Sequence, residues 1–203
     1  MKKQALTAAI IATISMPSMA DFIGIYAGID YGTNQTSLSN SSDSDNNSNL
    51  SGYLAFEHPI PVIPNIKLRY SDLSNNDISN DSSVMNGILY YEVFDNDLFE
   101  IDLGLTYTGT ESDNKSADLG QVYGAAKLHI PGVGMYAFAE AIGGSITDDN
   151  ALDVTGGLAY TFNPDSVLLN FIVRAGYRLQ EIEFKNTPKQ TNEGLFAGLE
   201  VHF

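Results

Sequence analysis

Apolar and polar residues alternate with a period of two through most of the chain after residue 20, and this pattern constrains the fold most. Successive side chains of a β-strand point to opposite faces, whereas a helix repeats every 3.6 residues. Globular strands are usually about five or six residues long, whereas about 9–11 residues cross a bilayer as a tilted strand. Most of the predicted strands have this longer length, and they cover residues 22–31, 50–58, 65–73, 84–93, 98–107, 119–130, 135–143, 152–162, 168–178 and 194–203.

The connections between these segments alternate in length. Short links occupy residues 59–64, 95–97, 131–134 and 163–166, and long polar links occupy residues 32–49, 74–83, 108–118, 144–151 and 179–193. Short turns at one end and long loops at the other are typical of a transmembrane β-barrel. We therefore predict an all-β fold, a single antiparallel transmembrane β-barrel of ten strands, with eight or twelve as the fallbacks. The low-complexity stretch 37–49 is expected to be a mobile loop.

One face of the predicted strands is apolar and is expected to contact lipid, for example at Ile25, Leu103 and Leu199. A charge at the bilayer midplane costs roughly 2–4 kcal/mol, and apart from tyrosine only His58 and Asp72 are ionisable on this face, both at strand ends. Aromatic belts are expected at both membrane interfaces, an outer one of Tyr31, Tyr70, Tyr107 and Tyr177 and an inner one of Phe56, Tyr91, Phe99, Tyr160 and Phe162.

The opposite face carries charges of both signs, which we expect to line the barrel interior. They are Glu57, Lys67, Arg69, Glu92, Glu100, Asp102, Lys127, Glu140, Asp153, Arg174, Arg178 and Glu200. Two interpretations stay open. Ion pairs such as Lys67 or Arg69 with Glu57 would close the interior, or the charges would line a narrow pore. Barrels of about eight strands are filled by side chains, and ten lies close to that number.

The N-terminal segment 1–20 has Lys2 and Lys3, an apolar run and a Ser-Met-Ala end, the pattern of a secretory signal peptide. We expect cleavage after Ala20, a barrel domain over residues 21–203, and location in the outer membrane of a Gram-negative bacterium. The remainder holds 8 Lys and Arg against 25 Asp and Glu, which disfavours nucleic acid as a partner. The chain has no cysteine, so neither disulfides nor thiolate sites are expected.

A secreted soluble barrel or sandwich is the main alternative, because its strands alternate as well. Its apolar face would then lie inside and its charged face in water. This alternative explains neither the strand lengths nor the aromatic belts.

An enzyme is not expected, and no catalytic residue, metal ligand or cofactor is assigned. The three histidines, His58, His129 and His202, fall at the short-turn end of the predicted barrel, away from any site at the outer rim. Asp43, Asp45 and Asn47 match the start of a calcium loop, but Ser48 and Leu54 stand where such a loop needs Gly and Glu. The cluster at residues 148–150 admits the same weak interpretation, and solvated acidic loops explain both.

The last residues, "LEVHF", resemble the C-terminal signal that the assembly machinery of outer-membrane barrels reads, with Leu199, Val201 and Phe203 as its apolar and aromatic positions. Several stretches also resemble a family of small Gram-negative outer-membrane barrels of unassigned function, the outer membrane protein with Gly-Gly group. They are "LAFEHPIPVIPNIKLRYSDLS" (54–74), "LYYEVFDN" (89–96), "IDLGLTYTG" (101–109), "VYGAAKLHIPGVG" (122–134), "VRAGYRLQEI" (173–182) and "GLFAGLEVHF" (194–203). The resemblance implies fold and location, and no activity.

The function expected from the sequence is that of an integral outer-membrane protein with a structural or surface role and a charge-paired, narrow lumen. A narrow or gated pore for small solutes and a surface adhesin or receptor acting through long acidic loops are the alternatives. The expected partners are outer-membrane lipid and lipopolysaccharide, the barrel-assembly machinery and periplasmic chaperones. A monomer is expected.

Overall fold

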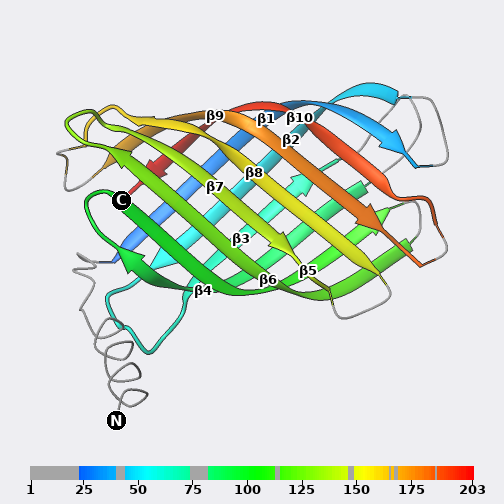
Figure 1. The fold of residues 1–203 in the computed structure, drawn as a ribbon, viewed down its shortest axis with the longest axis horizontal. Coiled ribbons are helices and arrows are strands. Elements are labelled where there is room, and N and C mark those ends of the chain that lie inside the picture. The colour runs from blue at the N-terminus through cyan, green and yellow to red at the C-terminus, as the bar shows by residue number, and fades with distance from the viewer. Residues whose placement is uncertain are drawn as a thin grey trace, which may run out of the picture.

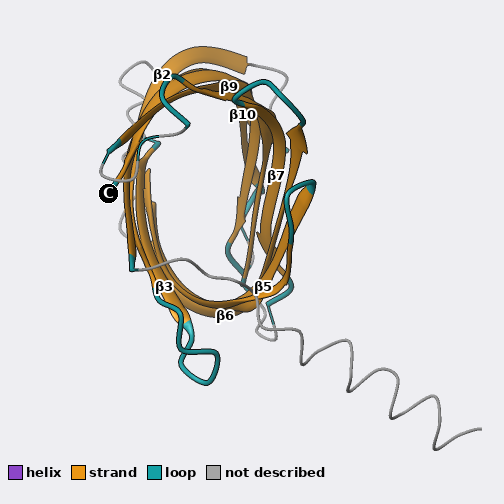
Figure 2. Ribbon diagram, turned by 90° about the vertical axis from the view of Figure 1, so that its left-hand side faces the viewer, coloured by secondary structure: helices purple, strands orange, loops and turns teal. Residues whose placement is uncertain are grey.

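The computed structural model describes residues 23–39, 44–73, 82–112, 115–145, 149–164, 166, 169–185 and 187–203. Ten antiparallel strands close on themselves in a single barrel (Figure 1; Figure 2). They are β1 (Gly24–Leu38), β2 (Ser44–Glu57), β3 (Asn65–Asp72), β4 (Ser82–Asp95), β5 (Phe99–Ser112), β6 (Lys115–Ile130), β7 (Met135–Gly143), β8 (Asn150–Thr161), β9 (Asn170–Glu183) and β10 (Gln190–His202).

Each strand pairs with its neighbours in sequence, and the barrel closes between β1 and β10. That closing register runs from Tyr26 opposite His202 to Leu38 opposite Gln190. The predicted fold class and strand number are confirmed. The predicted signal peptide 1–20 lies outside the described residues.

The two rims of the barrel differ. The end at which β1 begins and β10 ends carries the connections 58–64, 96–98, 131–134 and 162–169, and we call it the turn rim (Figure 1). Gly132 has φ +79° in one of these turns, a conformation that residues with a Cβ rarely adopt. The opposite end is the loop rim, where β1 connects to β2 and β9 to β10.

The long loops predicted at residues 32–49, 108–118 and 179–193 are wrong, because strands cover most of each range. Most of the stretch 37–49, expected to be a mobile loop, belongs to β1 and β2. These strands pair from Ser37 opposite Ser44 at the loop rim to Gly24 opposite Glu57 at the turn rim. In β5 and β6 pairing likewise reaches Ser112 opposite Lys115. Beyond the membrane both faces of a strand meet water, so hydrophobic alternation stops while backbone hydrogen bonding continues. A prediction based on alternation therefore ends these strands too early.

The apolar face is the outside of the barrel. Leu105 is 68% exposed and Leu195 67% exposed, and most of the predicted lipid-facing side chains are exposed with them. Contiguous apolar surfaces of this extent are rare on soluble monomers. The soluble alternative is therefore wrong, and this face meets lipid. No helix long and apolar enough to span a membrane occurs among the described residues.

Eight of the nine predicted belt residues are exposed on this outer face. The exception is Phe99, which is half-buried because its ring stacks on that of Phe94 at a centroid distance of 4.7 Å. The outer tyrosines do not mark the strand ends, since β1 continues for seven residues past Tyr31. The barrel therefore projects beyond the outer belt.

Glycines on the inner face leave space for large side chains and allow neighbouring strands to approach closely. A Cβ on Gly28 would lie within 2.5 Å of the Tyr53 ring, which occupies that space in the interior. Gly157 of β8 lies opposite Gly176 of β9. A Cβ on Gly157 would come within 2.2 Å of the carbonyl oxygen of Ala175, so the backbone approach there requires glycine.

Candidate functional site: the charged barrel interior

All twelve charged residues predicted for the interior lie on the inner face, and none of their side chains is exposed. The strands bring them there because every second residue points inward. The odd or even position of a residue in its strand therefore determines whether its charge lies in the interior. It does not say which partner the charge meets across the barrel.

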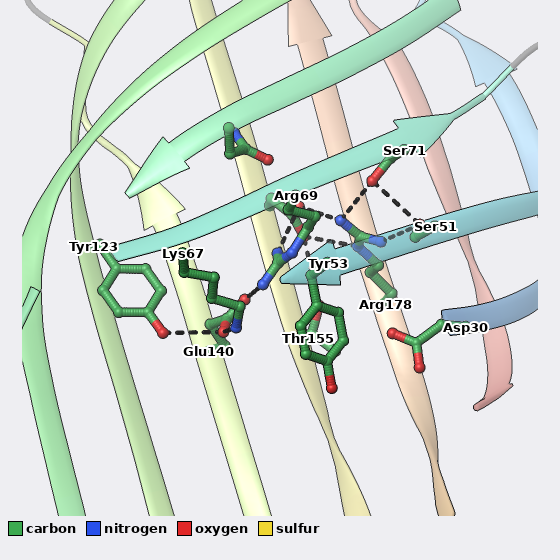
Figure 3. A network of polar contacts seen from close by, with 12 residues as sticks. Asp30, Ser51, Tyr53, Lys67, Arg69, Ser71, Tyr123, Glu140, Thr155 and Arg178 are labelled. Atoms are coloured by element: carbon green, nitrogen blue, oxygen red, sulfur yellow. Dashed lines mark hydrogen bonds and ion pairs between the residues drawn. The ribbon is translucent and has the colours of Figure 1, made fainter. Parts of the chain in front are cut away.

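Asp153 of β8 is the centre of the largest group. The Nη2 and Nε atoms of Arg178 lie 2.5 and 3.0 Å from its carboxylate oxygens, and Nη1 of Arg69 lies 3.3 Å from Oδ2. Arg178 also donates to the hydroxyls of Ser51 at 2.6 Å and Ser71 at 3.0 Å (Figure 3). Arg178 is on β9, whereas both serines and Arg69 are on β2 and β3. The contacts therefore cross the lumen.

Glu140 of β7 continues this group. It forms ion pairs with Lys67 and Arg69, and it accepts a hydrogen bond from the Tyr123 hydroxyl at 3.0 Å (Figure 3). We call Lys67, Arg69, Glu140, Asp153 and Arg178, with Ser51 and Ser71, the cross-lumen network. Lys67, Arg69, Asp153 and Arg178 are buried and Glu140 is half-buried, so their mutual pairing is what makes their burial tolerable.

A second group lies beside this network. Nε of Arg174 is 3.2 Å from Oδ1 of Asp30, and its Nη1 is 3.7 Å from Oε2 of Glu200. Tyr53 links the two sides, because its hydroxyl bonds to Glu200 and accepts a hydrogen bond from Arg174 at 2.7 Å. The Arg174 guanidinium also lies 4.6 Å from the Phe138 ring centroid, a cation–π contact.

The predicted pairing of Lys67 or Arg69 with Glu57 is wrong. Glu57 instead accepts a hydrogen bond from the Tyr90 hydroxyl at 2.6 Å. The long basic side chains reach across the lumen to Glu140 and Asp153, which the prediction, limited to adjacent strands, did not consider. Asp30 and Tyr53 were missed. The inward parity of Asp30 in the first strand is the signal that could have found it.

The interior holds small cavities on either side of the cross-lumen network. One of about 80 Å³ lies toward the turn rim, and one of about 10 Å³ lies toward the loop rim. Toward the loop rim, polar side chains bond to directly opposite partners on neighbouring strands, as Thr36 does to Asn192 at 2.8 Å and Asn86 to Thr108 at 2.9 Å. The described interior is packed with hydrogen-bonded side chains at its middle.

The histidines lie at the turn rim, as the strand directions predict. His58 follows β2, His202 ends β10, and Nε2 of His129 lies 2.7 Å from Oε1 of Glu100. Over the part of the chain that the structure describes, no three His, Asp or Glu side chains are arranged to hold a metal ion.

The two weak calcium patterns gain no support. Asp43 and Asp148 lie outside the described residues, and Asn47 belongs to strand β2, so its backbone is extended instead of wound into a calcium loop. Asp149 accepts a hydrogen bond from the backbone N–H of Lys185 at 2.7 Å.

No protein-family model matches the sequence, and no curated protein matches it. One solved structure similar to this chain is Neisserial surface protein A, at 19% identity, with 88% of this chain and 97% of that one covered and a TM-score of 0.48. Another is Ail, the attachment invasion locus protein of Yersinia pestis, crystallised with the heparin analogue sucrose octasulfate. It is 14% identical, with 88% and 99% of the chains covered and a TM-score of 0.33.

Both likenesses are too distant to transfer a residue or an activity, and the resemblance to the Gly-Gly group stays a prediction. The assignment depends on the architecture itself. Ten strands close without a free edge, the outer face is apolar and the charged side chains predicted for the interior lie inside. The chain therefore has the fold of a small outer-membrane β-barrel protein.

Proposed function

We propose that this protein has a structural or surface role in the outer membrane and that its interior does not conduct solutes. The observation that supports this is the cross-lumen network, which joins β8 and β9 to β2 and β3 through buried ion pairs and hydrogen bonds. A solute passing through the barrel would have to separate these pairs. Separating buried charges is expensive, because each would lose its partner without regaining water.

The alternative of a narrow pore is tested by planar-bilayer conductance of the refolded protein. We expect no discrete openings from the natural sequence. The triple variant Arg69→Ala, Asp153→Ala, Arg178→Ala leaves the Lys67–Glu140 pair balanced and should produce openings, because it removes the middle of the packed layer. Circular dichroism checks that both proteins are folded barrels.

A matched control for the conductance test is Glu181→Ala with Lys189→Ala. It removes an ion pair of 2.8 Å outside the cross-lumen network and should stay silent. Stable, discrete openings of the natural protein would contradict the closed interior and favour the pore.

The adhesin or receptor alternative is retained because of one feature, the extension of the strands past the outer belt. Residues 32–37 of β1 pair with residues 44–49 of β2, and both segments are rich in hydroxyl and amide side chains. This ribbon, not a long loop, would present the binding surface. Cells carrying a chain shortened between residues 34 and 47 should then lose adhesion to protein-coated surfaces, with the barrel still assembled. Unchanged adhesion would exclude the ribbon.

A further inference from the structure

The charges of the interior do not balance. Five basic side chains, Lys67, Arg69, Lys127, Arg174 and Arg178, form ion pairs with five carboxylates, Asp30, Glu100, Glu140, Asp153 and Glu200. Three further inward carboxylates, Glu57, Glu92 and Asp102, form no ion pair within the described residues. These eight carboxyl groups therefore outnumber the five basic side chains of the interior by three.

These three carboxylates lie together in the half of the barrel nearer the turn rim. Glu92 and Asp102 are directly opposite each other on β4 and β5. Glu57 is held by the Tyr90 hydroxyl at 2.6 Å, and Glu92 accepts a hydrogen bond from the Asn65 side chain at 2.9 Å. Glu57 and Glu92 thus each accept a hydrogen bond from a neutral donor.

Asp102 differs from the other two. Its side chain is buried, with the residue 8% exposed, and its Oδ1 has no hydrogen-bond partner among the described residues. Leaving a buried charged acceptor unsatisfied is costly. A buried polar atom without a partner in a folded protein requires an explanation, and one explanation is that the atom binds a ligand.

Asp102 lines the cavity of about 80 Å³, and so does Glu57. Five tyrosines, Tyr26, Tyr53, Tyr90, Tyr123 and Tyr136, share its wall. The basic residues on the same wall, Lys67, Lys127 and Arg174, are paired with Glu140, Glu100 and Asp30 respectively. The cavity thus combines unpaired carboxylates with aromatic rings, and we call it the acidic cavity.

We propose that the acidic cavity binds a small organic cation, of the class of primary alkylammonium ions, which enters from the turn rim. An ammonium group would donate charge-assisted hydrogen bonds to Asp102 and Glu57. The tyrosine rings would add cation–π attraction around its alkyl part. A metal ion fits less well, because the described acidic side chains do not converge in a group of three.

Size and access support this ligand class. A cavity needs about 10–15 Å³ of such volume for one water, so 80 Å³ holds a group of several heavy atoms. Tyr26, Glu57 and Tyr136 are partly exposed and lie toward the turn rim, whereas the cross-lumen network lies on the other side of the cavity. Binding does not require solutes to cross the barrel, so the inference is independent of the proposed function.

The test is isothermal titration calorimetry of the folded mature protein in detergent micelles, with propylammonium as the probe and potassium as the size control. We expect saturable binding of one propylammonium per barrel, with potassium giving no comparable saturation. Asp102→Asn should weaken propylammonium binding at least tenfold. Glu111→Gln, the same chemical change at an exposed position near the loop-rim end of β5, should leave it unchanged.

A second measurement separates loss of binding from loss of folding. Without ligand, Asp102→Asn should unfold at a higher temperature than the natural protein, because it removes an unpaired buried charge. Propylammonium should raise the unfolding temperature of the natural protein but not that of the variant. Should Asp102→Asn fail to fold, Glu57→Gln, which keeps an acceptor for Tyr90, takes its place. Absence of saturable binding, or equal binding by these variants, would overturn the proposal.

Discussion

At the residue scale, the inner charges make the contacts that join distant strands. Arg178 alone contacts Asp153, Ser51 and Ser71, and it thereby joins strands from nearly opposite walls. Its burial means that water cannot replace a lost partner. A buried ion pair is weak evidence for net stability, but removal of one partner leaves the other charge stranded.

We therefore expect Arg178→Met to lower the free energy of unfolding by about 3–5 kcal/mol, because Asp153 loses its main partner. Urea unfolding in micelles measures the change. The double variant Arg178→Met, Asp153→Asn should be less destabilised than the sum of the single variants, since it strands no charge. Lys189→Met, which breaks a partly exposed pair with Glu181, serves as the control and should show little change. Additive effects of the two interior substitutions would contradict the pairing.

At the scale of the element, β8 and β9 depend on glycine where they approach closely. The adjacent glycines of β8 differ in their surroundings. A Cβ on Gly157 would lie 2.2 Å from the Ala175 carbonyl oxygen, whereas a Cβ on Gly156 meets its nearest neighbour, the Phe138 carbonyl oxygen, at 3.6 Å. The first distance is a clash with backbone that cannot rotate away, and the second is ordinary contact.

Gly157→Ala should accordingly destabilise the barrel by about 1–3 kcal/mol through overpacking. Gly156→Ala, one residue away and with the same loss of backbone freedom in the unfolded chain, should be close to neutral. Thermal unfolding of both variants in the same detergent gives the comparison. Equal unfolding temperatures would show that β8 can move away from β9 and that the close approach is not required.

At the scale of the whole molecule, closure between the first and last strands decides whether a barrel exists. The backbone N–H of Phe203 donates to the Ile25 carbonyl at 2.9 Å, and the N–H of Ile25 donates to the Phe203 carbonyl at 3.1 Å. The Phe203 side chain takes no part in these bonds and is 54% exposed. We propose that the ring acts during assembly, as the signal that the barrel-assembly machinery reads.

Phe203→Ala should then reduce the amount of barrel in the outer membrane of living cells several-fold, while refolding of the purified chain into micelles stays efficient. Quantitative immunoblotting of membrane fractions and circular dichroism measure the two outcomes. Phe162→Ala removes another exposed aromatic ring near the turn rim, 62% exposed, and should leave the cellular level unchanged. Equal losses for the two variants would mean that the aromatic ring matters for membrane contact and not as an address.

The strands and their two faces follow from the sequence alone. A period of two sets which side chains point outward, and the hydrocarbon of the membrane admits only apolar side chains on that outer face. Ile25, Leu103 and Leu199 are recognisable as lipid-facing for this reason, and the inward placement of Arg178 and Asp102 follows from the same parity. The strand ends at the loop rim were not recognisable, because in water neither face of residues 32–38 and 44–49 needs to be apolar.

The ion-pair partners of the charged side chains inside the barrel depend on the tertiary structure. Parity says that Lys67 and Glu57 both point inward, but which carboxylate a basic side chain reaches depends on barrel diameter, strand tilt and register. These quantities result from closing all ten strands together. In the closed barrel, Lys67 forms an ion pair with Glu140 across the lumen. Asp102 lies beside a cavity, and its Oδ1 has no hydrogen-bond partner among the described residues. Both results depend on residues far apart in the chain, whose distances no local pattern encodes.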